Sequence, residues 1–113
     1  AVGPIKSNLL QNMPKLKLSA EKFVLRLDEK IILMGDSLIR EDFSELAGLA
    51  HWLKGSAGTI GFHDFTEPAI KLENSAKENN TSNARYWFTT IKHMAENIDL
   101  SNAPDKYSSR EIS

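Results

Sequence analysis

The sequence predicts an all-α domain, folded as an antiparallel up-and-down four-helix bundle with a short additional N-terminal helix. From residue 19 to about residue 99, apolar side chains recur at spacings of three and four, the periodicity of an amphipathic helix. No stretch alternates apolar and polar residues for long enough to indicate a strand. Short polar segments separate the patterned stretches, so consecutive helices are expected to run side by side in opposite directions.

The first two elements are defined by prolines and by one long apolar stripe. Residues 4–13 place apolar side chains on one face, begin with a proline that suits a first helical turn, and end before Pro14. A long helix then opens at Ser19 and continues to about Arg40 on the stripe Phe23, Leu27, Ile31, Met34 and Leu38. Gly35 interrupts this stripe. Because glycine costs about 1 kcal/mol relative to alanine in a helix, we expect a kink or a break there.

The third helix has the clearest pattern of all. Asp42, followed three residues later by Glu45, matches a capping box just before an apolar run. The apolar seam alternates steps of three and four through Phe43, Leu46, Ala50, Leu53, Ala57 and Ile60. This is the packing stripe of a helix in an antiparallel bundle.

Two further helices complete the predicted bundle. After Gly61, Asp64 and Glu67 form a second candidate capping pair, and Pro68 lies deep enough in the helix to distort its first turn. On the fourth helix, the side chains expected to face the core are Phe65, Ala69, Leu72 and Ala76. Residues 79–83 are predicted to be a loop. The fifth helix buries Ala84, Trp87 or Phe88, Ile91, Met94 or Ala95, and Ile98.

The chain is thus expected to comprise an N-terminal segment with a short helix (1–18), a four-helix bundle (19–99) and a flexible tail (100–113). Its 14 basic and 15 acidic residues give a net charge of −1, with no positive surplus to hold a nucleic-acid backbone. The absence of cysteine excludes disulfides and Cys-ligated metal sites. No apolar run reaches the roughly 18 residues that span a bilayer. We expect a cytoplasmic domain that contacts neither nucleic acid nor membrane and is monomeric when isolated.

The third helix contains an anomaly that points to function. It includes three glycines, which together cost about 2.5–3 kcal/mol of helix propensity relative to alanine: Gly48, Gly55 and Gly58. At about 100° per residue they cluster with Ala47 and His51 on a flank beside the seam, whereas glycines that serve helix packing would lie on the seam itself. His51 is therefore expected to be surrounded by small side chains, which leave room for a second protein to approach. Lys54, one turn onward, brings an ammonium near the imidazole.

An exposed neutral histidine beside a cation suits a nucleophile that accepts an anionic group. A phosphate-binding loop fits poorly, since no strand precedes the glycines and Lys54 comes before Gly55 rather than after the last glycine. A di-iron site needs a glutamate three residues before a histidine. The residues three before His51, His63 and His93 are Gly48, Ile60 and Thr90, so we predict no metal site.

Residues 51–61, with the sequence HWLKGSAGTIG, resemble the signature of histidine-containing phosphotransfer (HPt) domains of two-component phosphorelays. The family pattern is a phosphorylatable histidine with lysine at +3, glycine at +4, a small residue at +5 and glycine at +10, and every position matches. The resemblance implies a four-helix bundle in which His51 is the phosphoacceptor, Lys54 stabilises phosphate and Gly55 admits the partner. It extends to Glu73 on the next helix, which would orient His51 through its other ring nitrogen.

The resemblance also implies partners. His51 would take a phosphoryl group from a receiver-domain aspartate and pass it to the aspartate of a response regulator. The domain would be the C-terminal module of a hybrid sensor histidine kinase, tethered through it to the inner membrane. It would have no ATP site or bound cofactor of its own, and Mg²⁺ would belong to the partner receiver domain.

A shallow apolar patch around His51 is the expected docking surface for the receiver: Ala47, Gly48, Trp52, Gly58 and Phe62. An alternative is a docking bundle that binds receiver or kinase domains without being phosphorylated. The intact His51 and Lys54 argue against this alternative.

Overall fold

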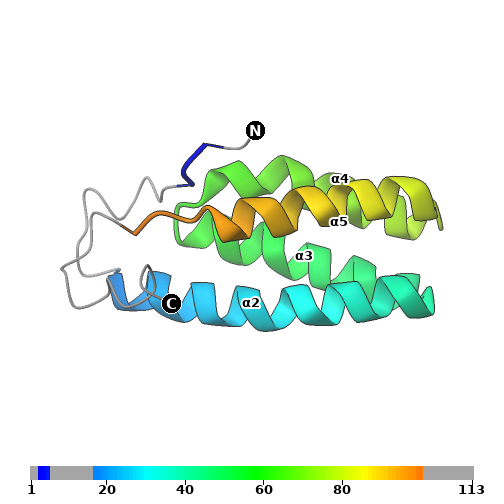
Figure 1. The fold of residues 1–113 in the computed structure, drawn as a ribbon, viewed down its shortest axis with the longest axis horizontal. Helices are drawn as coiled ribbons and strands as arrows, with labels where there is room; N and C mark the ends of the chain where they lie inside the picture. Colours follow the sequence, from blue (N-terminus) through cyan, green and yellow to red (C-terminus); the bar gives the residue numbers. More distant parts are fainter. Residues whose placement is uncertain (1–2, 6–16, 101–113) are drawn as a thin grey trace.

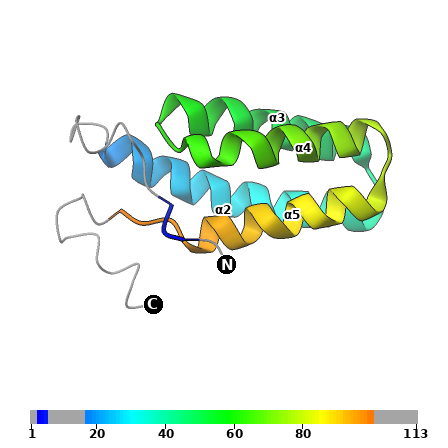
Figure 2. The same ribbon diagram turned by 90° about the horizontal axis from the view of Figure 1, so that it is seen from above.

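The computed structural model describes residues 3–5 and 17–100, in which four α-helices form the fold (Figure 1). They are α2 (Lys17–Arg40), α3 (Phe43–Thr59), α4 (Thr66–Lys77) and α5 (Thr81–Glu96), with a short 3-10 turn, η2 (His63–Phe65), before α4. Both views show the helices side by side along the long axis, each running opposite to the one before it (Figures 1 and 2). The predicted all-α four-helix bundle is confirmed.

The described N-terminal residues are extended and do not begin a helix. The backbone N–H of Ile5 donates to the carbonyl of Asn97 at 2.9 Å, and the N–H of Asp99 donates to the carbonyl of Ile5 at 2.7 Å. Ile5 is buried by this bridge. The prediction of a helix from residue 4 is therefore wrong at its start, and the rest of that prediction, residues 6–13, lies outside the described residues. So does the predicted tail from residue 101 onward, whereas Leu100 packs partly buried against the core.

Helix α2 begins two residues before Ser19 and continues without a break through Gly35. A Cβ atom at Gly35 would lie 3.2 Å from the Cζ atom of Phe88 on α5. The glycine therefore allows α5 to approach closely, and this packing offsets its low helix propensity. The predicted stripe lies in the core along α2, with Ile31 only partly buried.

The corner between α2 and α3 is held by one arginine. The side chain of Asp42 accepts the Glu45 backbone N–H at 3.1 Å, as the capping box requires. The Glu45 carboxylate does not return to Asp42 but accepts from Arg40 at 3.2 Å. Arg40 also donates to Asp36 at 2.8 Å, and the hydrogen bonds that it donates to Asp36 and then to Glu45 raise its pKa above the usual range. Only half of the predicted capping box forms.

Gly61 ends α3 and directs the next residue into the core. Its φ of 89° is a left-handed conformation, its N–H donates to the carbonyl of Gly58 at 3.2 Å, and the Phe62 N–H donates to that of Ala57 at 2.8 Å. This bonding pattern is a Schellman motif, in which the residue after the glycine packs back on the helix. Phe62 is accordingly fully buried and stacks on Phe23 with ring centroids 5.4 Å apart.

The predicted capping pair of Asp64 and Glu67 is wrong, because the chain enters α4 through η2 and no side chain caps α4. Phe65 is fully buried at this entry, against the ring of Phe23. Pro68 is the third residue of α4, where its missing N–H removes no intrahelical bond. All four predicted inward residues of α4 are buried.

Helix α5 begins earlier than predicted. The Asn80 side chain accepts the backbone N–H of Asn83 at 3.1 Å, so residues 81–83 form the first helical turn and only residues 78–80 remain as the connection. The inner face of α5 is confirmed, with Ala84, Ile91, Met94 and Ala95 buried, and Trp87, Phe88 and Ile98 partly buried against the core.

Candidate functional site

His51 lies on the outer face of α3, with 65% of its side chain exposed. The adjacent seam residues Ala50 and Leu53 are fully buried, and Phe43 is partly buried. The periodicity of an α-helix then turns the residue beside the seam toward solvent. The predicted seam of α3 is confirmed, and with it the outward position of His51.

The glycines around His51 leave open space. Apart from its own turn of helix, a Cβ atom built at Gly48, Gly55 or Gly58 would meet no atom within 4 Å. This differs from Gly35, where a neighbouring ring fills the space. Close packing inside the bundle therefore does not require the three glycines, and their effect is to keep both sides of the imidazole unobstructed.

The imidazole of His51 contacts Glu73, which lies on the neighbouring helix α4. Its carboxylate Oε2 atom lies 3.3 Å from Nδ1 of His51 and 3.1 Å from Nζ of Lys77, and its side chain is 11% exposed. Burial raises the pKa of Glu73, but the hydrogen bond from Lys77 and the positive charges of Lys77, protonated His51 and Lys54 lower it by more. The net pKa lies below its ordinary value, so the carboxylate is ionised at neutral pH.

Lys54 is half-buried one turn after His51 on the same helix. Its positive charge is one of those that lower the pKa of Glu73. The site therefore combines an exposed imidazole, one buried carboxylate and two ammonium groups. Such an arrangement suits an imidazole that accepts an anionic group from another molecule.

Two grooves flank His51. The first, of about 590 Å³, lies between α2 and α3 and is lined by Phe23 and Trp52 together with the cations Lys22 and Arg26. The second, of about 530 Å³, lies between α3 and α4; its lining includes Phe43, Ala47, Gly48, Glu73 and Lys77. His51 lines both grooves, so it lies on the ridge between them.

The predicted docking residues divide between these surfaces. Gly48 and Ala47 line the second groove, although Ala47 is only 9% exposed. Trp52 lines the first groove, and Gly58 is half-buried. The prediction for Phe62 was wrong, because the Schellman turn at Gly61 places this ring in the core.

Trp52 lines the first groove and also packs, partly buried, against the hydrophobic core. Its ring stacks on Phe23 with centroids 6.0 Å apart, and Nζ of Lys30 lies 5.4 Å from its centroid. The helical pattern did not indicate that α2 contributes to the site through the cations Lys22 and Arg26. Their spacing of four on the flank of the α2 stripe was visible, but only the packing of α2 on α3 brings them beside His51.

The other two histidines, His63 and His93, are exposed and lie outside this cluster. Across residues 3–5 and 17–100, His, Asp and Glu side chains nowhere gather in a group of three or more that could hold a metal ion. Within the same residues, no helix is both long and apolar enough to cross a membrane.

A helical bundle that presents an exposed histidine between glycines is suited to carrying a transferred group on that side chain. The family model of the Hpt domain matches residues 10–100, and the chain belongs to the Hpt domain family. It is therefore a phosphotransfer domain of two-component signalling, a family whose members interact with receiver domains and response regulators. Searches of curated proteins and of solved structures found no match to this chain.

Proposed function

We propose that this domain is a phosphorelay intermediate that accepts a phosphoryl group on His51 from a receiver-domain aspartate and passes it to the aspartate of a response regulator. The placement of His51 carries the proposal. The imidazole is exposed, open space lies over the glycines on both sides, and Nδ1 faces a buried carboxylate.

The contact with Glu73 selects the attacking nitrogen. When Nδ1 holds the proton and donates it to Oε2 of Glu73, the lone pair is on Nε2, the atom directed away from α4. The Nε2–P bond forms as the P–O bond of the phospho-aspartate breaks, and that electron pair leaves on the aspartate carboxylate. The ring then carries a positive charge, which the ionised Glu73 stabilises. Transfer to the second receiver reverses these steps.

The remaining catalysis is positioning and charge neutralisation. The three equatorial oxygens of the phosphoryl group carry the negative charge, and Lys54, one turn after His51 on α3, would stabilise them. Mg²⁺ in the receiver would neutralise the rest, so this domain needs no nucleotide site of its own. Gly55 leaves room for the receiver, and the cations Lys22 and Arg26 in the first groove suit a partner with an acidic surface.

Transfer from a phosphorylated receiver tests this function. The wild-type chain should take up acid-labile label, and His51→Gln should take up none. His93→Gln is the matched control, because His93 is 63% exposed and also lies near a carboxylate, with Nδ1 3.7 Å from Oε1 of Glu96. This control should be labelled like the wild type.

Two results would contradict the proposal. Label on His51→Gln would place the acceptor elsewhere. A wild-type chain that binds the phosphorylated receiver but takes up no label would indicate the docking bundle instead.

A further inference from the structure

The buried carboxylate beside His51 contacts two side chains that can carry positive charge, and both contacts are made by one oxygen atom. Oε2 of Glu73 lies 3.3 Å from Nδ1 of His51 and 3.1 Å from Nζ of Lys77. Lys77 follows Glu73 by one helical turn on α4, so both side chains lie on the same side of that helix. The proposed transfer steps use Glu73 and leave Lys77 without a role.

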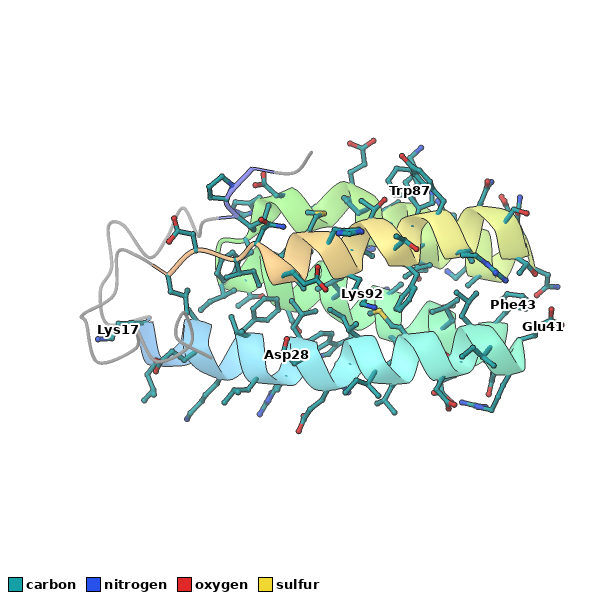
Figure 3. All side chains as sticks on the ribbon, in the orientation of Figure 1. Lys17, Asp28, Glu41, Phe43, Trp87 and Lys92 are labelled. Atoms are coloured by element: carbon teal, nitrogen blue, oxygen red, sulfur yellow. The ribbon has the colours of Figure 1, made fainter. Side chains whose placement is uncertain are left out.

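Both contacts lie in the second groove, between α3 and α4. This groove is lined by His51 and by Phe43, which Figure 3 shows beside Glu41 at the end of the bundle where α2 connects to α3. Lys77 also lines the groove, with 63% of its side chain exposed, whereas that of Glu73 is 11% exposed. The ammonium therefore reaches the carboxylate from the solvent side, and the imidazole reaches it from α3.

A carboxylate that is mostly buried needs a cation to remain ionised in its place. Burial raises the pKa of Glu73, and among the interactions that lower this pKa the hydrogen bond from Lys77 is the strongest. The charges of protonated His51 and of Lys54, both on α3, lower it less. Without Lys77, the carboxylate would gain solvation by rotating out of the groove toward water.

We propose that Lys77 is a positioning residue that holds Oε2 of Glu73 against Nδ1 of His51, an inference that rests on the proposed function of His51. A neutral imidazole has one N–H, and its hydrogen bond decides which nitrogen carries the proton. While Lys77 holds the carboxylate in the groove, the proton stays on Nδ1 and the attacking lone pair stays on Nε2. When the carboxylate turns to solvent, the proton is free to occupy Nε2, and that tautomer cannot attack through Nε2.

Single-turnover transfer from a phosphorylated receiver tests the role of Lys77. Lys77→Met removes the ammonium but keeps an unbranched side chain, and we expect the rate of His51 phosphorylation to fall about fivefold. Lys77→Arg keeps a charged donor and should restore most of the rate. Lys71→Met is the matched control and should transfer at the wild-type rate. Lys71 is exposed on α4 two residues before Glu73, and the helix turns these two positions to nearly opposite sides.

Two further measurements separate positioning from a merely structural role. In a chain that already carries Glu73→Gln, adding Lys77→Met should change the rate little, whereas two independent effects would multiply. Nitrogen-15 NMR of the His51 ring at about pH 8.5, where ordinary imidazoles are neutral, reports the tautomer without any receiver. The wild type and Lys71→Met should hold the proton on Nδ1, and Lys77→Met should show a mixture of both tautomers.

A Lys77→Met chain that transfers as fast as the wild type would overturn the proposal. So would an unchanged tautomer, or an effect that multiplies with that of Glu73→Gln. These results leave the phosphotransfer function intact as long as the wild type is labelled and His51→Gln is not. A wild-type chain that takes up no label contradicts the function itself, and the tautomer still decides whether Lys77 positions Glu73. Circular dichroism would verify that each variant is folded.

Discussion

At the scale of single residues, His51 and His93 differ in their surroundings rather than in their exposure. Both side chains are about two-thirds exposed, and each has a carboxylate within 4 Å of Nδ1. The carboxylate beside His51 is 11% exposed, whereas Glu96 beside His93 is 58% exposed. Solvent weakens the electrostatic attraction within an exposed ion pair, whereas a carboxylate that is buried in the bundle keeps a fixed position. This contact distinguishes the candidate acceptor from an ordinary surface histidine.

Replacing Glu73 should therefore slow transfer without abolishing it. Glu73→Gln keeps the shape of the side chain but removes the negative charge that faces the imidazolium. A hydrogen bond to a charged group contributes about 1.5–3 kcal/mol, so we expect the rate of His51 phosphorylation to fall about 10- to 100-fold. Single-turnover transfer from a phosphorylated receiver measures this rate. Glu96→Gln should transfer at the wild-type rate, and equal rates for both variants would show that Glu73 has no part in the reaction.

Gly55 should show a conflict between stability and activity. Because a Cβ atom there meets nothing within 4 Å, Gly55→Ala should raise the free energy of unfolding by about 1 kcal/mol. The larger Gly55→Gln should block the approach of the receiver and slow transfer about tenfold. Urea unfolding and single-turnover transfer measure the two effects.

Gly35→Ala is the control for both measurements. It should transfer normally and gain less stability, because the new methyl group displaces the Phe88 ring. A less stable Gly55→Ala would show instead that Gly55 serves packing inside the bundle.

At the scale of elements, the two candidate capping pairs had the same sequence pattern and different outcomes. Asp42 bonds the Glu45 N–H, whereas Asp64 falls in the 3-10 turn and caps nothing. The difference comes from the aromatic cluster below: burial of Phe62 and Phe65 sets how the chain enters α4. The capping pattern spans only four residues, so it does not reflect the burial of these two rings.

Asp42→Ala should accordingly destabilise the fold and Asp64→Ala should not. Loss of an N-cap costs about 1 kcal/mol, and Asp42 also loses its contact with Arg40 at 3.3 Å. We expect Asp64→Ala to remain within about 0.5 kcal/mol of the wild type. Urea unfolding of the two variants measures the difference, and equal stabilities would show that the Asp42 cap contributes nothing to the fold.

The sequence predicted the helices well because their inner faces follow one periodicity from α2 to α5. It also placed His51 beside the seam, since that follows from the helix alone. The contact of His51 with Glu73 joins two helices and came only from the family resemblance. The groove cations Lys22 and Arg26 were missed for the same reason: helix periodicity does not say which neighbouring helix a flank will face.

At the scale of the whole molecule, Glu73 links stability to pH. Its pKa in the folded chain is below the ordinary value of 4.5, mainly because Lys77 and the other cations outweigh the effect of burial. A group with a lowered folded pKa stabilises the fold above its unfolded pKa, and this contribution is lost as the pH falls through the folded value. Acid should therefore weaken the wild-type fold more than one that lacks this carboxylate.

Unfolding by urea at a series of pH values measures this effect. The difference in the free energy of unfolding between wild type and Glu73→Gln should be constant well above pH 4.5. Below pH 4.5 the wild type should lose more stability than the variant. A difference that does not change with pH would show that Glu73 has the same pKa in the folded and unfolded chains.

In the proposed transfer, Nε2 of His51 carries the phosphoryl group while Nδ1 stays against Glu73. Nitrogen–phosphorus correlation NMR of the ¹⁵N-labelled chain, phosphorylated by a receiver, tests it most directly. We expect one phosphorus-coupled nitrogen, the Nε2 atom of His51, and no such signal from His51→Gln. Coupling to Nδ1 of His51, or to a nitrogen of His63 or His93, would contradict it.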